Sequence, residues 1–294
     1  MQDLNNLEQL LSTGKISRRE FLTRVSALGL MAAMSPGLLT TTAKAATPKQ
    51  GGRFRLGVGG GATTDTLDPG TLSTTAPQMV HMQARNCLTE LNHEYKPIPE
   101  LAESWESSPD ASKWIFKLRK GVEFHNGKTM DAEDVVFSIN YHRGEQSKSS
   151  GKGLVDPVTD IKIDDKYTVV FELEGGNADF PFIMSDYHLT IVPAGTTNFE
   201  DGMGTGAYKL VSWEPGVRAM TKKNPNYWQK GIPKIDNVIC RIIPEISTRT
   251  AELVSGGIDF GLNFTPDTWD TLEKSKSAIP MDVPILRVNF WQFD

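Results

Sequence analysis

The chain has 294 residues, of which 38% are hydrophobic and 23% are charged, and its formal charge at pH 7 is -5. This length suits about two folded domains, and the acidic balance argues against nucleic acid or an anionic membrane surface as a partner. The two cysteines, Cys87 and Cys240, lie far apart and lack the spacing of metal ligands. Their pattern favours two buried thiols over a disulfide between them or a structural zinc site.

The N-terminal segment has the parts of a cleavable export signal. Arg18 and Arg19 form an arginine pair, the apolar run Val25–Met34 follows, and a small-residue site stands at Ala43-Lys44-Ala45. The apolar run is shorter than the about 20 residues that cross a bilayer. We therefore predict a twin-arginine-type signal peptide over residues 1–45, export by the Tat route and a periplasmic location. An amphipathic N-terminal helix with incidental arginines is the alternative.

A glycine-rich segment follows the first predicted strand, Arg53–Val58. Gly57–Ala62 matches G-x-G-x-x-A, a pattern that dinucleotide-binding turns share. Such a turn opens a helix, whereas the residues that follow here are β-branched and interrupted by Asp68-Pro69. The pattern therefore favours a flexible or ligand-facing loop.

A helix is predicted from Pro77, because apolar residues recur at helical spacing and proline is tolerated in a first turn. The apolar positions of this predicted helix are Val80, Ala84, Cys87, Leu88 and Leu91. His81 and His93 flank it without a third ligand at a helical offset, so we expect ordinary surface histidines and no metal site.

Strands joined by tight turns are predicted next, with Trp114, Phe116 and Leu118 on one face and a hairpin-type turn at Asn126-Gly127. A helix then starts after Asp131, whose side chain can accept from the first free N–H groups. The acids of this turn are expected to cap the helix and not to act as general acids or bases.

The rest of the chain alternates strands with short helices. A helix over Thr248–Val254 is predicted to be capped by Ser247, and another starts at Thr265. The predicted strands are Tyr167–Leu173, Ala207–Trp213, Val217–Lys222, Val238–Ile243 and Ile258–Leu262. This alternation predicts an α/β or mixed α+β chain with a mixed sheet.

Seven short motifs give the chain a resemblance to a known family. They are Leu67-Asp68-Pro69, Pro99-Glu100-Leu101-Ala102-Glu103-Ser104-Trp105, Phe116-Lys117-Leu118-Arg119-Lys120-Gly121-Val122, Ala132-Glu133-Asp134-Val135-Val136-Phe137-Ser138, Gly204-Thr205-Gly206-Ala207-Tyr208, Asn224-Pro225-Asn226-Tyr227-Trp228 and Ser255-Gly256-Gly257-Ile258-Asp259. In this order and approximate spacing they resemble the family-5 extracellular solute-binding proteins, the peptide, nickel and opine binders of ABC importers.

The resemblance implies a periplasmic-binding-protein-like fold with two lobes. The first lobe would join a mixed-sheet domain, residues 46–88 and 201–283, to a smaller inserted domain, residues 89–200. Residues 284–294 would be a strand that crosses towards a second lobe, which we do not expect in this chain. In the family, closure of the lobes traps the solute and the closed form docks on a membrane permease.

The resemblance further implies a non-enzymatic binder, monomeric when complete, for peptides or peptide-sized solutes and without a cofactor. A binder of nickel chelate, haem or opine in the same fold is the first alternative. A secreted hydrolase is the second, although the sequence holds neither G-x-S-x-G nor H-E-x-x-H.

We predict that Thr74 and Thr75 contact the ligand, because their counterparts in the family approach the cleft. The alternative for both residues is N-capping and loop hydrogen bonding ahead of Pro77. Tryptophans at positions 105, 114, 213 and 228 are expected in the core and not as ligand platforms.

Overall fold

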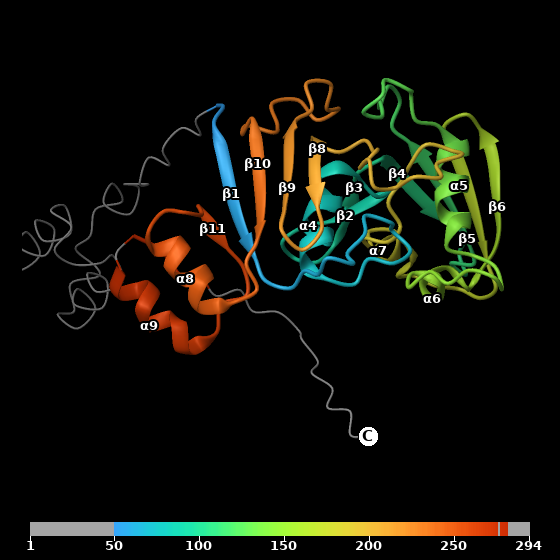
Figure 1. Ribbon diagram of the computed structural model, residues 1–294. Helices are drawn as coiled ribbons and strands as arrows, with labels where there is room; N and C mark the ends of the chain where they lie inside the picture. Colours follow the sequence, from blue (N-terminus) through green and yellow to red (C-terminus); the bar gives the residue numbers. More distant parts are fainter. Residues whose placement is uncertain (1–49, 276, 282–294) are drawn as a thin grey trace, which may run out of the picture. The chain divides into compact units, whose positions relative to one another are not determined.

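The structure, a computed structural model, describes residues 50–275 and 277–281. The predicted signal peptide and the predicted crossing strand at 284–294 lie outside the described residues. Within the described residues, none of the helices is long and apolar enough to span a membrane. The strands form a five-stranded sheet, a four-stranded sheet and a separate pair (Figure 1).

The five-stranded sheet is mixed, as the sequence predicts. Its order is β11-β1-β10-β9-β8, and β1 runs parallel to both β10 and β11, whereas β9 is antiparallel to β8 and β10. The strands span Arg53–Val58 (β1), Tyr208–Glu214 (β8), Arg218–Lys223 (β9), Asn237–Ile242 (β10) and Phe260–Gly261 (β11). The predicted strand at Ile258–Leu262 is thus shorter than expected.

The four-stranded sheet is antiparallel and comes from one continuous stretch of chain. Its order is β4-β5-β7-β6, with the strands at Ala102–Ser107 (β4), Lys113–Leu118 (β5), Val158–Asp165 (β6) and Thr168–Leu173 (β7). The period-two alternation of β5 places Trp114, Phe116 and Leu118 on its buried face, as predicted. The separate pair joins β2 (Thr89–Leu91) to β3 (Pro97–Pro99).

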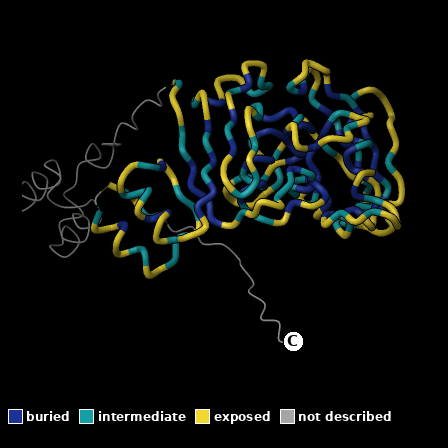
Figure 2. Tube along the Cα trace, in the orientation of Figure 1, coloured by how far each residue is buried: buried dark blue, intermediate teal, exposed yellow. Residues whose placement is uncertain are grey.

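Each of the two large sheets has its own hydrophobic core, which appears as dark blue segments in Figure 2. Trp114 belongs to the core of the four-stranded sheet, and Trp105 and Trp228 pack against it. Trp213 packs against the core of the five-stranded sheet. The predicted structural role of the four tryptophans is therefore confirmed, and both cysteines are free, buried thiols.

Six helices are described. They span Thr75–Ala84 (α4), Ala132–Tyr141 (α5), Lys152–Val155 (α6), Phe180–Ile183 (α7), Ile246–Val254 (α8) and Pro266–Ser275 (α9). Helix α4 ends at Ala84, so the helical spacing that continues through Leu91 predicted a helix that is too long. Arg85 is extended, with φ -132°, and the residues that follow turn into β2. Cys87 and Leu88 are buried by strand pairing and loop packing instead, and Leu91 is half-buried in β2.

The predicted cap of α8 is also wrong. The helix begins at Ile246, so Ser247 lies inside its first turn, and Glu245 is the N-cap residue. The carbonyl of Glu245 accepts from the N–H of Arg249 at 3.0 Å, which closes the first turn. A serine next to a helical pattern indicates a helix start, but here the N-cap residue lies two positions earlier, at Glu245.

Candidate ligand-binding loop

A loop of residues 59–74 leaves the carboxyl end of β1 and leads into α4. In sheets with parallel strands, ligands commonly bind beyond the carboxyl ends of those strands. The carboxyl ends of β1 and its two parallel neighbours lie together here, since the N–H of Ile243 donates to Val58 O at 2.7 Å and the N–H of Leu262 donates to Gly57 O at 3.1 Å. The loop therefore starts where the topology places a ligand site.

Buried Arg249 lies beneath the start of this loop. Its guanidinium donates to four main-chain carbonyls at 2.5–3.1 Å, those of Ile243 and Pro244 after β10 and of Leu262 and Asn263 after β11. Among the described residues no carboxylate pairs with it, and burial lowers its pKa. Arg249 thus ties together the ends of two strands.

The two glycines of the G-x-G-x-x-A pattern are explained by packing. A Cβ at Gly57, in β1, would overlap the Ile258 side chain, and one at Gly59 would lie 2.9 Å from Nη1 of Arg249. A turn at Thr63 and Thr64 follows in place of a helix. The G-x-G-x-x-A pattern is therefore a close-packing requirement, and the described geometry lacks the helix that a dinucleotide turn needs.

Asp65 organises the tip of the loop. Its Oδ2 accepts from the N–H of Ala62 at 2.8 Å, and its Oδ1 accepts from the Thr74 hydroxyl at 3.0 Å. These two bonds join the two ends of the loop around one carboxylate. Thr63 and Thr64 are left exposed at the tip.

Two further carboxylates fix the middle of the loop. Glu200 Oε1 accepts from the Thr66 hydroxyl at 2.5 Å and from the N–H of Leu67 at 2.9 Å. Asp68 accepts from the hydroxyl of Tyr141, at 2.9 Å and 2.8 Å to its two oxygens. Partial burial, and then this carboxylate, raise the pKa of Tyr141. The loop is therefore bonded to α5 and to the segment that precedes β8.

Arg85 and His81 also hold the loop in place. The guanidinium of Arg85 donates to the carbonyls of Leu67, Phe199 and Met203 at 2.6–2.9 Å, and its Nη1 lies 2.7 Å from Nδ1 of His81. Because arginine only donates, Nδ1 must accept, and the proton of the neutral ring is on Nε2, which donates to Thr190 Oγ1 at 2.8 Å.

The environment of His81 corrects our expectation of a surface histidine. The side chain is 1% exposed, and burial and then Arg85 hold its pKa well below the usual value. Burial also lowers the pKa of Arg85 to about 10. His93 is exposed, as expected.

The predicted ligand residues lie side by side where the loop meets α4. Thr74 is the N-cap residue, but its hydroxyl bonds Asp65, and no side-chain capping bond is present within the described chain. Thr75 is half-buried at the first helical position, and no described residue bonds its hydroxyl. The structure brings the two residues together at the loop, with different hydrogen-bonding states.

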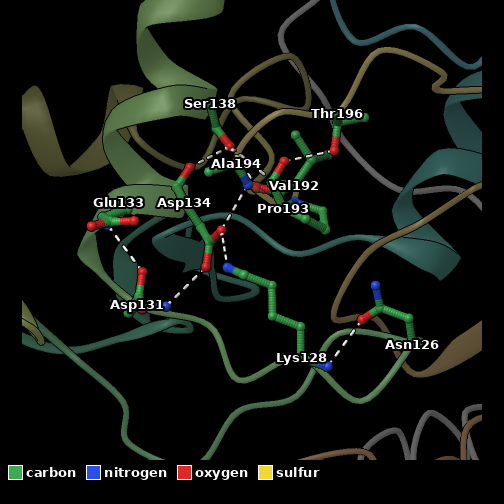
Figure 3. A network of polar contacts seen from close by, with 10 residues as sticks. All are labelled: Asn126, Lys128, Asp131, Glu133, Asp134, Ser138, Val192, Pro193, Ala194 and Thr196. Carbon is green, nitrogen blue, oxygen red and sulfur yellow. Dashed lines mark hydrogen bonds and ion pairs between the residues drawn. The ribbon is translucent and has the colours of Figure 1, made fainter.

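The acidic turn before α5 is structural, as predicted (Figure 3). Asp131 caps the helix by accepting from the N–H of Glu133 at 3.1 Å. Asp134 is fully buried and accepts from the N–H of Asp131 at 3.0 Å, from the N–H of Ala194 at 2.7 Å and from the ammonium of Lys128. These donors occupy both oxygens of Asp134 and link three segments of chain.

Sequence reasoning missed the residues that hold the loop. Asp65 could have been suspected from its place in a turn-rich segment, because aspartate commonly bonds nearby main-chain groups there. The roles of Glu200 and Arg249 depend on contacts that form only in the folded chain. Glu200 and Thr66 are 134 residues apart, and no local pattern signals their pairing.

Comparison with known proteins supports the fold and the family. Residues 96–294 match the sequence model of the bacterial extracellular solute-binding proteins, family 5, middle region. The dipeptide-binding protein of Escherichia coli strain K12 is 31% identical over 225 residues, a match that covers 67% of this chain and 42% of that protein.

Two solved structures share the fold. The PBP AgaA from A. tumefaciens R10, in complex with agropinic acid, has a TM-score of 0.71 and 27% identity, and the match covers 76% of this chain and 46% of that one. The periplasmic binding protein DppA from Helicobacter pylori, in complex with the peptide STSA, has a TM-score of 0.68 and 25% identity, over 77% of this chain and 49% of that one.

The chain thus spans under half the length of each of these relatives. Their likeness confirms the predicted mixed α/β, periplasmic-binding-protein-like fold. Family 5 consists of extracellular substrate-binding proteins of transport systems, as the resemblance in the sequence implied. Because the family's sequence model matches well over half of the residues, this chain belongs to the bacterial extracellular solute-binding proteins of family 5.

Proposed function

We propose that this chain acts in the periplasmic substrate-binding component of an ABC importer. It binds di- or oligopeptides, or peptide-sized solutes, for delivery to a membrane permease, and it catalyses no reaction. The observation that carries this proposal is the loop at residues 59–74. It starts at the carboxyl ends of parallel strands, is held by side-chain hydrogen bonds, and has an exposed tip. The 31% sequence identity to a dipeptide-binding protein supports the choice of solute.

Thr75 and Thr74 have separate roles in this proposal. An extended peptide presents main-chain N–H and C=O groups, which the exposed loop tip can pair with, as in other cases of strand-like peptide capture. The hydroxyl of Thr75 can both donate to and accept from such a ligand. Thr74 contacts the ligand less directly, because its hydroxyl already holds Asp65.

A titration followed by amide NMR tests the site. Peptide mixtures should shift the amide signals of residues 62–75, and Thr75→Val should weaken binding about three- to tenfold, the effect of one lost neutral hydrogen bond. Thr74→Val should shift the signals of the loop tip even before peptide is added. Thr248→Val, at an exposed position in the first turn of α8, is the matched control. Peptide shifts confined to other regions would refute the site.

An opine-like solute is the second candidate, because AgaA, solved with agropinic acid, is 27% identical. Competition separates the two candidates. A low concentration of agropinic acid could abolish the peptide-induced shifts, which would then return only at high peptide concentration. That result would favour an opine as the solute.

We also propose the predicted export route and organisation. The twin-arginine pair directs the chain to the periplasm, residues 46–88 with 201–283 and residues 89–200 form two domains, and the complete protein is a monomer. The separate five-stranded and four-stranded sheets support this division.

The export proposal is tested by replacing Arg18 and Arg19 with lysine together. Lysine keeps the charge but not the planar guanidinium geometry, so we expect the periplasmic yield to fall to background. An unchanged yield in a fractionation experiment would contradict the Tat route and indicate Sec export.

A further inference from the structure

Two short segments connect the five-stranded sheet and its helix α4 to the four-stranded sheet. Residues 84–88 lead out of α4, and residues 203–207 lead back into β8. The two segments lie side by side, because the N–H of Gly206 donates to Ala84 O at 2.9 Å and a Cβ at Gly204 would overlap that oxygen. A titratable group buried beside both segments can therefore affect how the two sheets are joined.

Glu100 is such a group. It lies between β3 and β4 and is 7% exposed. Its Oε2 accepts from the N–H of Cys87 at 2.7 Å, and its Oε1 lies 2.5 Å from Nδ2 of Asn86. The other end of the Asn86 amide, Oδ1, lies 3.0 Å from the Thr205 hydroxyl and 3.5 Å from Nε1 of Trp228. Asn86 and Thr205 belong to the two segments, so the pair Glu100–Asn86 reaches both of them.

No positive charge compensates the carboxyl group of Glu100 within the described chain, where none of the ion pairs includes it. Arg119 bonds the main chain of Glu100 instead, 3.1 Å from Nε to the carbonyl, and its guanidinium stacks 4.5 Å from the Trp228 ring. The other titratable groups around the carboxyl are neutral or negative: Glu90, Tyr227 and the Cys87 thiol. Burial therefore raises the pKa of Glu100 to about 8, although its two hydrogen bonds oppose this effect.

The distance between Glu100 and Asn86 suits a neutral carboxyl group. A separation of 2.5 Å is usual for an O–H···O bond, about 2.5–3.0 Å, and short for an N–H···O bond, about 2.7–3.2 Å. When the amide turns by 180°, Asn86 Oδ1 accepts from the hydroxyl of protonated Glu100. The Asn86 NH₂ group then donates to the Thr205 hydroxyl, which can accept as well as donate.

We propose that Glu100 and Asn86 form a proton-dependent switch at the connection between the two sheets. With its proton, Glu100 donates to Asn86 and the buried pair is neutral. Without the proton, the amide turns its NH₂ group to the carboxylate, and the N–H of Trp228 gains Asn86 Oδ1 as an acceptor. The charge then left between the sheets is costly to bury, so water enters and the connection loosens. This inference is independent of the solute.

Carbon-13 NMR of the glutamate carboxyl groups tests the protonation step. In the 294-residue chain, the signal that Glu100→Gln lacks belongs to Glu100, and its expected midpoint is near pH 8. The indole N–H signal of Trp228, assigned with Trp228→Phe, should shift with the same midpoint, because its acceptor changes. A carboxyl midpoint below about pH 6, or an indole signal that does not follow the carboxyl, would overturn the inference.

Stability measurements test the cost of the charge. The folded chain keeps the Glu100 proton up to about pH 8, whereas the unfolded chain loses it near pH 4.5, so stability falls as pH rises through this window. Glutamine reproduces the neutral state, because its NH₂ group can donate to Asn86 Oδ1 and its oxygen can accept from the Cys87 N–H. Glu100→Gln should therefore match the unmodified chain at pH 4.5 and unfold at a higher urea concentration at pH 8.5.

Hydrogen exchange tests the loosening itself. At pH 8.5, peptides that cover residues 203–207 should exchange about tenfold faster in the unmodified chain than in Glu100→Gln, and at pH 6 they should exchange equally. Glu106→Gln, at an exposed position of β4, is the matched control and should keep the pH dependence of the unmodified chain. Equal exchange at pH 8.5, or a Glu100→Gln variant that is less stable than the unmodified chain at this pH, would show that the ionised carboxylate belongs to the closed connection and would refute the switch.

Discussion

Two buried arginines in this chain bind main-chain carbonyls in place of carboxylates. Arg85 holds the loop before α4, and Arg249 holds the ends of β10 and β11. A carbonyl at a strand end has no ladder partner, and the guanidinium supplies five donors in a fixed plane. The arginines therefore satisfy groups that the sheet leaves open.

The geometry of Arg249 predicts that lysine cannot replace it. Arg249→Lys leaves three donors for four carbonyls, and one or more buried oxygens lose their partner. We expect the free energy of unfolding to fall by about 1–3 kcal/mol in urea denaturation. Arg218→Lys, at an exposed ion pair with Glu214, should change it little. Equal stability of the two variants would show that solvent reaches the carbonyls.

The buried histidine His142 predicts a pH dependence of stability. Burial and then His188 lower its pKa from 6.5 to about 4, and its Nδ1 lies 2.6 Å from the Ser149 hydroxyl. Between these values the unfolded chain binds the proton and the folded chain does not, so stability is complete above pH 6.5 and falls as pH decreases towards 4. The loss attributable to this residue is at most about 3 kcal/mol.

His142→Asn should reduce that pH dependence, because asparagine can bond Ser149 but does not titrate. Urea unfolding at several pH values gives the slope of the unfolding free energy against pH. His93→Asn, at an exposed position, should keep the slope of the unmodified chain. An unchanged slope in His142→Asn would assign the acid sensitivity to other groups, among them buried His81.

At the scale of elements, the sequence predicted the presence of strands and helices better than the positions of helix ends. The alternation in β5 and the capping aspartate of α5 are local features, and both predictions are confirmed. The end of α4 depends on Arg85, which must leave the helical path to bond carbonyls far along the chain. Helical spacing in the residues beyond it gives no indication of that requirement.

The cap of α5 makes a prediction at this scale. Asp131→Ala removes one capping bond and should lower the free energy of unfolding by about 0.5–2 kcal/mol, with peptide affinity unchanged. Asp131→Ser retains an acceptor and should recover most of the loss. Thermal denaturation and peptide titration on the same samples measure both effects. A clear loss of affinity at normal stability would place Asp131 in the binding site.

At the scale of the whole molecule, the sequence motifs predicted the family and the mixed sheet, and the loop between β1 and α4 as a site. The hydrogen bonds that hold that loop could not be predicted from the sequence. They join Asp65, Glu200 and Tyr141 from separate parts of the chain, and such pairings follow from the packing of both sheets. Thr74 was predicted to contact the ligand, with N-capping and loop hydrogen bonding as the alternative, and its bond to Asp65 required the structure.

The hydrogen bonds from the loop to Glu200 predict a local change in dynamics. Glu200→Ala removes the acceptor for Thr66 and for the N–H of Leu67, so this segment should open more readily. We expect about tenfold faster hydrogen exchange at Leu67, and unchanged exchange in β7. Mass spectrometry of exchanged peptides measures both. Uniform acceleration in the two regions would instead indicate global destabilisation.

The parallel pairing of β1 with β10 has a consequence for the order of folding. Gly52 bonds Asp236 across 184 residues, whereas the four-stranded sheet lies within Ala102–Leu173. At about 5–20 residues per second, a ribosome needs about 10–40 s to make the chain between those two partners. During that interval β1 has no partner strand, and the later sheet can form before the earlier strand is paired. β1, the first of the described strands to be made, is thus among the last to be paired.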